Sequence, residues 1–255
     1  MKGKVYLVGS GPGGTAFLTQ RGRAVIDRAD VVLFDQLPGR EILATLPTYA
    51  EKIDCGKYGG KHTLEQEEIE ALMVDRARKG KLVVRLKGGD PFLFGRGGEE
   101  LETVRTAGIP VEMVPGVSSA LAVPASIGIP LTHRKYASQV TVLTGNEDPT
   151  KPGPALDWEL LAKSRGTIVI LMGVANLAKI AKVLMKNGKP TDTPVAIIER
   201  GLRVDRRVTL GSLANIAGAA KTAGVKPPAV IVIGDVVKLY DPKDPDLIPV
   251  EEVEE

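Results

Sequence analysis

The sequence predicts an α/β protein of two domains with mostly parallel sheets. Short apolar, β-branched segments alternate with segments of helical periodicity along most of the 255 residues. Several apolar segments lack polar alternation, as is typical of strands covered on both faces. The alternation breaks near Pro115, where a Pro-Gly turn separates two series. We therefore expect an N-terminal domain over residues 1–114, a C-terminal domain over 115–240 and an acidic tail over 241–255.

Eight segments are predicted as strands because Val, Ile and Leu are concentrated in them between turn residues. In chain order they are Lys4–Val8, Val31–Phe34, Leu82–Leu86, Val111–Val114, Val140–Thr144, Thr167–Met172, Val195–Glu199 and Val230–Ile233.

Three helices are readable between these strands. Thr63 and Gln66 have the spacing of a capping box, and apolar residues then recur on one face up to Gly80. Ser118–Ile127 has the pattern of a short helix. A third helix is predicted from about Asn176 to Asn187, before a Gly-Lys-Pro terminator. The segment from Gly145 to Pro154 has three prolines and no periodicity, which predicts a loop.

Composition excludes several classes of protein. Apolar residues make up 43% and charged residues 25%, as in ordinary globular proteins. No apolar run approaches the roughly 20 residues of a membrane span. The single cysteine, Cys55, excludes an internal disulfide framework and a cysteine-built zinc site, and two histidines argue against a histidine-rich one. We predict a cytoplasmic protein without a metal site.

The charge distribution favours an acidic small molecule as the partner. The net charge is +3, and four of the last five residues are glutamates, so the rest of the chain carries +7. A basic body suits nucleic acid or an acidic small molecule. Four Phe, one Trp and five Tyr are scattered, however, and no Lys/Arg block is present. We therefore expect neither nucleic acid nor membrane as a partner.

Three glycine-rich segments follow predicted strands. Gly9–Gly14 matches G-x-G-x-x-G in spacing, but Pro12 removes an amide that a dinucleotide pyrophosphate would use. Arg85–Glu100 combines glycines, a proline, acids and three basic side chains, more than a turn requires. Pro115–Ala120 is the third. A turn made only for folding remains an alternative for the first segment, and a helix N-cap at Ser118 for the third.

Taken in order, these segments resemble the signatures of the tetrapyrrole (corrin/porphyrin) methyltransferases. R-L-K-G-G-D-P-F-x-F-G-R-G is intact, and the resemblance extends from residue 4 to about 240. Gly14 departs from the pattern, since the family usually has Asp there. The matching segments are Gly9–Thr19, Val31–Leu37, Gly56–His62, Arg85–Gly97, Val114–Ala120, Gly128–Arg134, Met172–Gly173, Glu199–Gly201 and Pro228–Gly234.

The resemblance implies a fold, a reaction and a methyl donor. Two α/β domains would flank a cleft, and the protein would be a homodimer. S-adenosyl-L-methionine would methylate two pyrrole carbons of uroporphyrinogen III, giving precorrin-2 and S-adenosyl-L-homocysteine. We expect no fused dehydrogenase/chelatase module.

Three other functions stay open. One is methylation of a later corrin intermediate such as precorrin-4, and another is methylation of a macromolecule. The third is a non-catalytic nucleotide-sensing module with a Rossmann-like fold, against which Pro12 argues.

The resemblance also implies roles for particular residues. Asp35 and Lys57 would carry the acid–base chemistry, although a solvated strand-end acid and a surface lysine are the plain alternatives. The donor would contact Pro12, Gly88, Gly89, Asp90, Leu93, Ser118, Ser119, Met172, Gly201 and Ala229. Substrate carboxylates would bind basic residues, half of which could be surface groups: Arg85, Lys87, Arg96, His133 and Arg134, within a wider pool that includes Arg21 and His62.

The chemistry suits these residues. Methyl transfer from a sulfonium to carbon needs alignment and desolvation more than a nucleophilic side chain or a metal. An electron-rich pyrrole attacks through carbon, and one base suffices to remove the proton afterwards. The sequence therefore predicts catalysis without cysteine and without metal.

Overall fold

The computed structural model describes residues 3–58, 61–62, 64–147 and 156–243, without the side chains of 57, 58, 61 and 62. The chain divides into two compact units, Met1–Ser119 and Ala120–Glu255. The division lies at Ser119, whereas the sequence placed a boundary near Pro115. Most of the predicted Gly145–Pro154 loop and of the predicted acidic tail lies outside the described residues.

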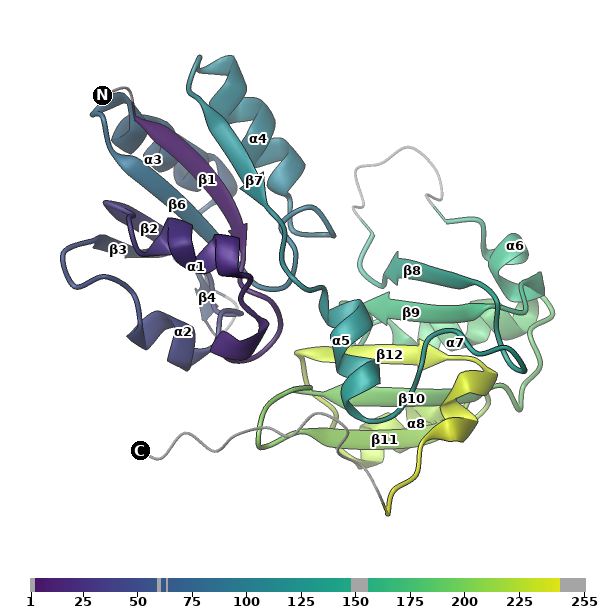
Figure 1. Cartoon of the computed structure of the whole chain (residues 1–255). Coiled ribbons are helices and arrows are strands. Elements are labelled where there is room, and N and C mark those ends of the chain that lie inside the picture. Colours follow the sequence, from purple (N-terminus) through teal and green to yellow (C-terminus); the bar gives the residue numbers. More distant parts are fainter. Residues whose placement is uncertain (1–2, 59–60, 63, 148–155, 244–255) are drawn as a thin grey trace. The chain divides into compact units, whose positions relative to one another are not determined.

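The first unit is built on a five-stranded sheet in which neighbouring strands all run parallel (Figure 1). The carboxyl ends of such strands meet at one edge, where α/β proteins bind ligands. The four predicted strands are confirmed, and a fifth, with the polar sequence Glu-Lys-Ile-Asp, was missed. In sheet order the strands are β3 (Glu51–Asp54), β2 (Val31–Phe34), β6 (Leu82–Lys87), β1 (Lys4–Gly9) and β7 (Val111–Val114).

Helices cover both faces of this sheet (Figure 1). On one face α3 (Gln66–Arg78) and α4 (Gly97–Thr106) bury side chains such as Met73 and Val104 against the strands. On the other face α1 (Gln20–Ile26) and α2 (Arg40–Ala44) bury apolar residues against Val8 and Leu86. Burial on both faces explains why β2 and most of β1 are continuously apolar. A short helix η1 (Thr15–Phe17) and a hairpin of β4 (Lys57–Tyr58) and β5 (Lys61–His62) complete the unit.

The start of α3 corrects the sequence prediction. Glu65 is the N-cap, and its backbone N–H donates to the Glu68 carboxylate at 2.7 Å, in a capping box three residues apart. Thr63 itself lies outside the described residues, and Gln66 is the first helical residue rather than the closing partner of a box. The sequence has two overlapping capping patterns here, Thr63 with Gln66 and Glu65 with Glu68. The helix begins with the second of them.

The second unit has a five-stranded sheet of a different kind (Figure 1). Only β8 and β9 pair in parallel, and the other three pairs are antiparallel. The α/β class is confirmed, but this sheet departs from the expected parallel arrangement. A central strand buried on both faces is continuously apolar whether it runs parallel or antiparallel to its neighbours. The sequence pattern therefore does not show the direction of the strand. In sheet order the strands are β11 (Arg207–Ser212), β10 (Pro194–Glu199), β12 (Ala229–Ile233), β9 (Thr167–Leu171) and β8 (Val140–Thr144).

Three helices cover one face of the second sheet: α6 (Trp158–Lys163), α7 (Leu177–Lys186) and α8 (Ile216–Thr222). The predicted helix from Asn176 to Asn187 is confirmed, with those two residues as its caps. The opposite face carries α5 (Ser119–Ser126), also predicted, and the short helix η2 (Asp235–Leu239) (Figure 1). Within the described part of the chain, no helix has the length and apolar character needed to cross a membrane.

Candidate active site

Three glycine-rich loops meet at the carboxyl edge of the first unit's sheet. They follow β1, β6 and β7, the three adjacent strands on one side of β2. The first two are joined by a pair of backbone hydrogen bonds: Gly11 N–H donates to Gly89 O at 3.2 Å, and Gly89 N–H donates to Gly11 O at 3.0 Å. The loops therefore form one connected backbone surface rather than three separate turns.

Glycine is required where these loops touch. A Cβ at Gly9 would lie 2.5 Å from Gly89 O and 2.6 Å from Gly116 Cα. A Cβ at Gly116 would lie 2.8 Å from Gly9 Cα and would also collide with Gly89 O. All these neighbours are backbone atoms, which cannot rotate away. The loops are thus interlocked through Gly9, Gly89 and Gly116.

Asp90 fastens the second loop to the third. One carboxylate oxygen accepts from Phe92 N–H at 2.8 Å, and the other accepts from Gly116 N–H at 3.2 Å. The side chain therefore holds the backbone of two loops in register.

Gly89 leaves open space at the centre of this surface. Its φ of +65° is in the left-handed region, and a Cβ there would find no atom nearer than Ser119 N at 3.8 Å. A ligand can therefore approach the loop backbone closely at this point. The residues predicted to bind the donor from this unit all lie in the three loops or at their ends: Pro12, Gly88, Gly89, Asp90, Leu93, Ser118 and Ser119.

The remaining predicted donor residues gather at one edge of the second sheet. Glu199 pairs with Ala229, and Leu171 pairs with Val230, so Met172, Gly201 and Ala229 lie at the same strand ends. Met172 is half exposed with a φ of +56°, and Arg200 has a φ of +46°. Strained backbone of this kind is characteristic of functional sites.

Two glycines at the same edge, Gly145 and Gly173, were not assigned to the site from the sequence. Gly145 N–H donates to Leu171 O at 2.7 Å, and a Cβ at Gly145 would lie 2.9 Å from Gly173 N. Asn176 Nδ2 donates to Gly145 O at 2.7 Å. The available signal was a glycine within two residues of the end of each of two neighbouring strands.

Asp35 lies at the carboxyl end of β2, on the same edge as the glycine loops. One carboxylate oxygen accepts from Leu37 N–H at 3.0 Å, and the other lies 3.7 Å from Arg85 Nη2. The side chain is 25% exposed, so it is held in place but still accessible. Lys57, its predicted partner, begins β4, and its side chain is outside what the structure describes.

Arg85 and Lys87 are buried rather than presented to solvent. Their side chains are 4% and 5% exposed, and both reach the fully buried carboxylate of Glu100. Arg85 Nε donates to Glu100 Oε1 at 3.1 Å, and Lys87 Nζ donates to the same oxygen at 2.8 Å. Both were predicted as partners of substrate carboxylates, but the structure engages them with an internal acid. Sequence reasoning did not single out Glu100.

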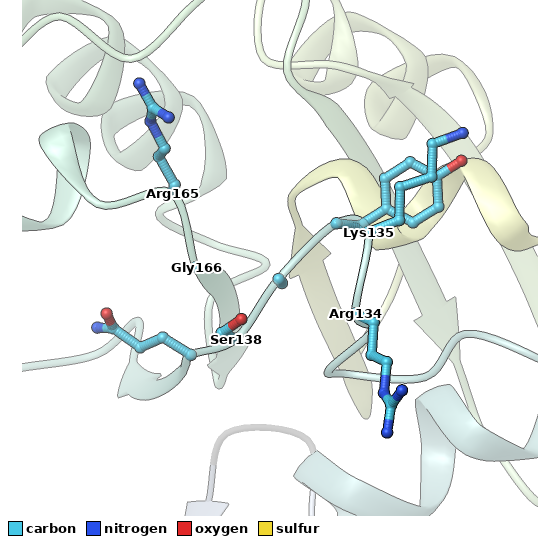
Figure 2. A pocket seen from close by; sticks show the side chains of 8 residues that line it. Arg134, Lys135, Ser138, Arg165 and Gly166 are labelled. Atoms are coloured by element: carbon cyan, nitrogen blue, oxygen red, sulfur yellow. The ribbon is translucent and has the colours of Figure 1, made fainter.

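Arg21, Arg96, His133 and Arg134 lie at the surface, and the predicted His62 side chain is outside what the structure describes. In the first unit Arg96 is paired with Glu99, and Arg21 with Glu112. In the second unit His133 and Arg134 lie between α5 and β8, and His133 Nδ1 accepts from Lys135 N–H at 3.2 Å. Arg134 lines a shallow cavity of about 280 Å³ together with Lys135 and Arg165. Figure 2 shows the two arginine side chains of this cavity pointing in different directions.

Gly14, where the resembled signature has Asp, has a carboxylate beside it from another element. A Cβ at Gly14 would collide with the side chain of Glu41, in the first turn of α2. The space that a longer residue would fill is therefore taken by an acid from the next helix. Among the described residues, no cluster of His, Cys, Asp and Glu is arranged to hold a metal ion.

Comparison with known proteins agrees with the geometry. A sequence profile of the tetrapyrrole (corrin/porphyrin) methylases matches residues 4–217. The S-adenosyl-L-methionine-dependent uroporphyrinogen III methyltransferase of Methanosarcina barkeri is 59% identical over 239 residues, 94% of each chain. The uroporphyrinogen-III C-methyltransferase of Methanocaldococcus jannaschii is 48% identical, over 94% of this chain and 99% of that protein.

Solved structures share the fold. Uroporphyrin-III C-methyl transferase from Thermus thermophilus, complexed with S-adenyl homocysteine, is 39% identical with a TM-score of 0.80, over 93% of this chain and 100% of that one. A cobalt precorrin-4 methyltransferase is 30% identical with a TM-score of 0.81, over 94% and 96%.

Proposed function

Because this chain belongs to the tetrapyrrole (corrin/porphyrin) methylase family, we propose that it methylates uroporphyrinogen III at two pyrrole carbons to give precorrin-2, with S-adenosyl-L-methionine as donor. The chain is an S-adenosyl-L-methionine-dependent methyltransferase that acts on tetrapyrroles. The observation that carries the proposal is the interlocked set of glycine loops at the carboxyl edge of a parallel sheet.

The residues of this edge fit the methyl donor. The open space over Gly89 and the fixed backbone around it offer amide and carbonyl groups to a polar ligand. When bound, the donor supplies an already activated methyl group on sulfur. The protein's task is to align that methyl with a pyrrole carbon and to exclude water. Rigid loops whose mutual positions are fixed by backbone contacts suit this task.

Asp35 is the residue we assign to proton removal. After the pyrrole carbon is alkylated, one proton must leave, and a carboxylate within hydrogen-bond reach serves as base. Asp35 is accessible, and its position is fixed by Leu37 N–H and by Arg85. Lys57 is proposed as its partner in proton transfer from the resemblance alone.

Exposed apolar side chains beside the loops suit the apolar faces of pyrrole rings. Leu37, Phe92 and Val117 are 49%, 48% and 38% exposed, and each belongs to a segment that follows a strand of the same edge. A Cβ at Gly88 would collide with Leu37, so Leu37 lies directly on the second loop. We assign the substrate's carboxylates to basic side chains at the surface, of which Arg96, His133 and Arg134 remain from the sequence prediction.

Methylation of a later corrin intermediate is the second candidate. The 30% identity to a cobalt precorrin-4 methyltransferase over nearly the whole chain supports the shared fold. The 59% and 48% identities to uroporphyrinogen III methyltransferases favour the first candidate. We further propose that the protein works in the cytoplasm as a homodimer, which light scattering after size exclusion would test.

An anaerobic assay tests the function. Purified protein, S-adenosyl-L-methionine and enzymatically generated uroporphyrinogen III are combined, and the product is followed by absorbance and mass. Addition of two methyl groups is the expected result. Donor binding without methylation of this macrocycle would overturn the substrate assignment, and the same assay with precorrin-4 would then test the second candidate.

A further inference from the structure

A buried cluster of charged side chains lies beneath Asp35. Glu100 from α4 is fully buried, and its Oε1 accepts hydrogen bonds from Arg85 and Lys87 of β6. Gln66 of α3 donates to the same oxygen at 3.2 Å. The Arg85 guanidinium also extends toward Asp35, and its Nη2 lies 3.7 Å from the Asp35 carboxylate. One oxygen of Glu100 thus joins α3, α4 and β6 just below the edge that carries the base.

The charges of this cluster balance only if all four members are counted. Arg85 and Lys87 carry two positive charges, and Glu100 and Asp35 carry two negative charges. An isolated buried charge is costly, so Glu100 is what allows two cations to lie within the fold. The second oxygen of Glu100 is buried and has no hydrogen-bond partner among the described residues.

We propose that Glu100 is the positioning residue for Asp35: it anchors the Arg85 guanidinium, and Arg85 in turn holds the Asp35 carboxylate at the sheet edge. Lys87 balances the charge of the cluster. The inference rests on the proposed function, in which Asp35 is the base. It also reassigns Arg85 and Lys87, which then support the base from within the fold rather than binding substrate carboxylates.

The groups around Asp35 determine what a charge change would do. Arg85 and Lys87 approach from β6 and Glu100 from α4, and Cys55 and Asp54 belong to the end of β3. Burial raises the pKa of the Cys55 thiol to about 11, so it stays neutral in the working range. Burial, together with the nearby Arg85 charge, lowers the pKa of Lys87. The charges that can be altered are therefore those of Glu100 and Lys87.

Two isosteric substitutions change the charge near Asp35 in opposite directions. Glu100→Gln removes a negative charge, so protonating Asp35 would need a lower pH. Lys87→Met removes a positive charge, so protonation would occur at a higher pH. We expect the acidic limb of the kcat–pH profile to move by about 0.5–1 pH unit, to lower pH in Glu100→Gln and to higher pH in Lys87→Met. Loss of the anchor in Glu100→Gln should also lower kcat about 10- to 100-fold, with donor binding unchanged.

The control is Glu112→Gln, which removes a carboxylate of the same unit from partly exposed ion pairs with Lys4 and Arg21. The double variant Glu100→Gln/Lys87→Met restores the charge balance and should return the acidic limb toward the wild-type position. It also covers the case in which Glu100→Gln alone does not fold. The proposal would be overturned if the folded variants had the same kcat and the same acidic limb of the kcat–pH profile as the wild type. It would also be overturned if the two single substitutions moved that limb in the same direction.

A measurement without turnover separates this proposal from the proposed function. The carboxyl ¹³C resonance of Asp35 can be titrated by NMR in the wild type and the same variants, in the absence of substrate. Opposite displacements of its midpoint are expected. If these are seen while the wild type fails to methylate uroporphyrinogen III, the proposed function falls and the positioning role stands. If the midpoint is the same in all variants, the positioning role falls.

Discussion

Replacing Gly116 by alanine is expected to disrupt the donor site through the backbone alone. The added Cβ would lie 2.8 Å from Gly9 Cα and would collide with Gly89 O, so it meets backbone on two sides. Relief requires the first or the second loop to move. Both loops are held by the Gly11–Gly89 hydrogen bonds, and the third by the bond from Gly116 N–H to Asp90.

The size of the effect follows from these contacts. Overpacking against groups that cannot rotate costs about 1–3 kcal/mol. For a unit the size of Met1–Ser119, we expect the melting temperature to fall by about 3–12 °C. Donor affinity should fall about tenfold or more, because the displaced loops carry the predicted donor contacts. Thermal unfolding and calorimetric titration with S-adenosyl-L-homocysteine measure the two quantities.

Gly98→Ala is the matched control. Gly98 lies in α4, and a Cβ there would meet nothing within 4 Å. This substitution should leave donor binding unchanged and stabilise the unit by about 0.5–1 kcal/mol, because alanine loses less backbone freedom on helix formation. If Gly116→Ala melts and binds like the wild type, the loops are not interlocked in the way the contacts imply.

Three further predictions follow from single side chains. Asp35→Asn should bind S-adenosyl-L-homocysteine normally but turn over about 100-fold or more slowly, and loss of donor binding with an unchanged single-turnover rate would refute its role as base. Burial tends to raise the pKa of Glu199, but hydrogen bonds from Arg207 and from Lys226 N–H outweigh it and lower the pKa. The folded state therefore gains stability above the unfolded pKa of about 4.3 and loses it as pH falls through the lower folded value. Arg207→Met should reduce stability at pH 7 by about 1–3 kcal/mol and flatten this acid dependence, as denaturant unfolding from pH 7 to 3 would show. Cys55 should resist a thiol reagent at pH 8 in the native protein, since burial raises its pKa to about 11, and react fully once unfolded; rapid native labelling would contradict this.

The order of the glycine loops could be predicted from the sequence because each loop directly follows an apolar strand. Parallel strands place their carboxyl ends together, so Gly11 and Gly89 meet although 78 residues separate them. Strand direction in the second unit could not be predicted in this way. The segment that forms β12 is apolar throughout, and its antiparallel pairing with β9 and β10 depends on the path of the connecting chain.

The fate of charged residues was the least predictable part of the site. Arg85 and Lys87 stand in a basic, glycine-rich string, and nothing in that string shows that Glu100, one helical turn into α4, pairs with both. Burial of a charge depends on a partner brought in by tertiary contact, which local pattern does not encode. The position of the Glu41 carboxylate beside Gly14 could not be predicted for the same reason, because tertiary contact brings together two residues of different elements.

The measurement that tests the central claim most directly is a crystal structure of the protein with S-adenosyl-L-homocysteine. The account predicts that the ligand lies against the backbone of the loops at Pro12, Gly88–Asp90 and Ser118–Ser119, with the open space over Gly89 filled. It also predicts that Glu100 remains paired with Arg85 and Lys87. A ligand bound elsewhere, with these loops untouched, would contradict the assignment of the glycine loops as the donor site.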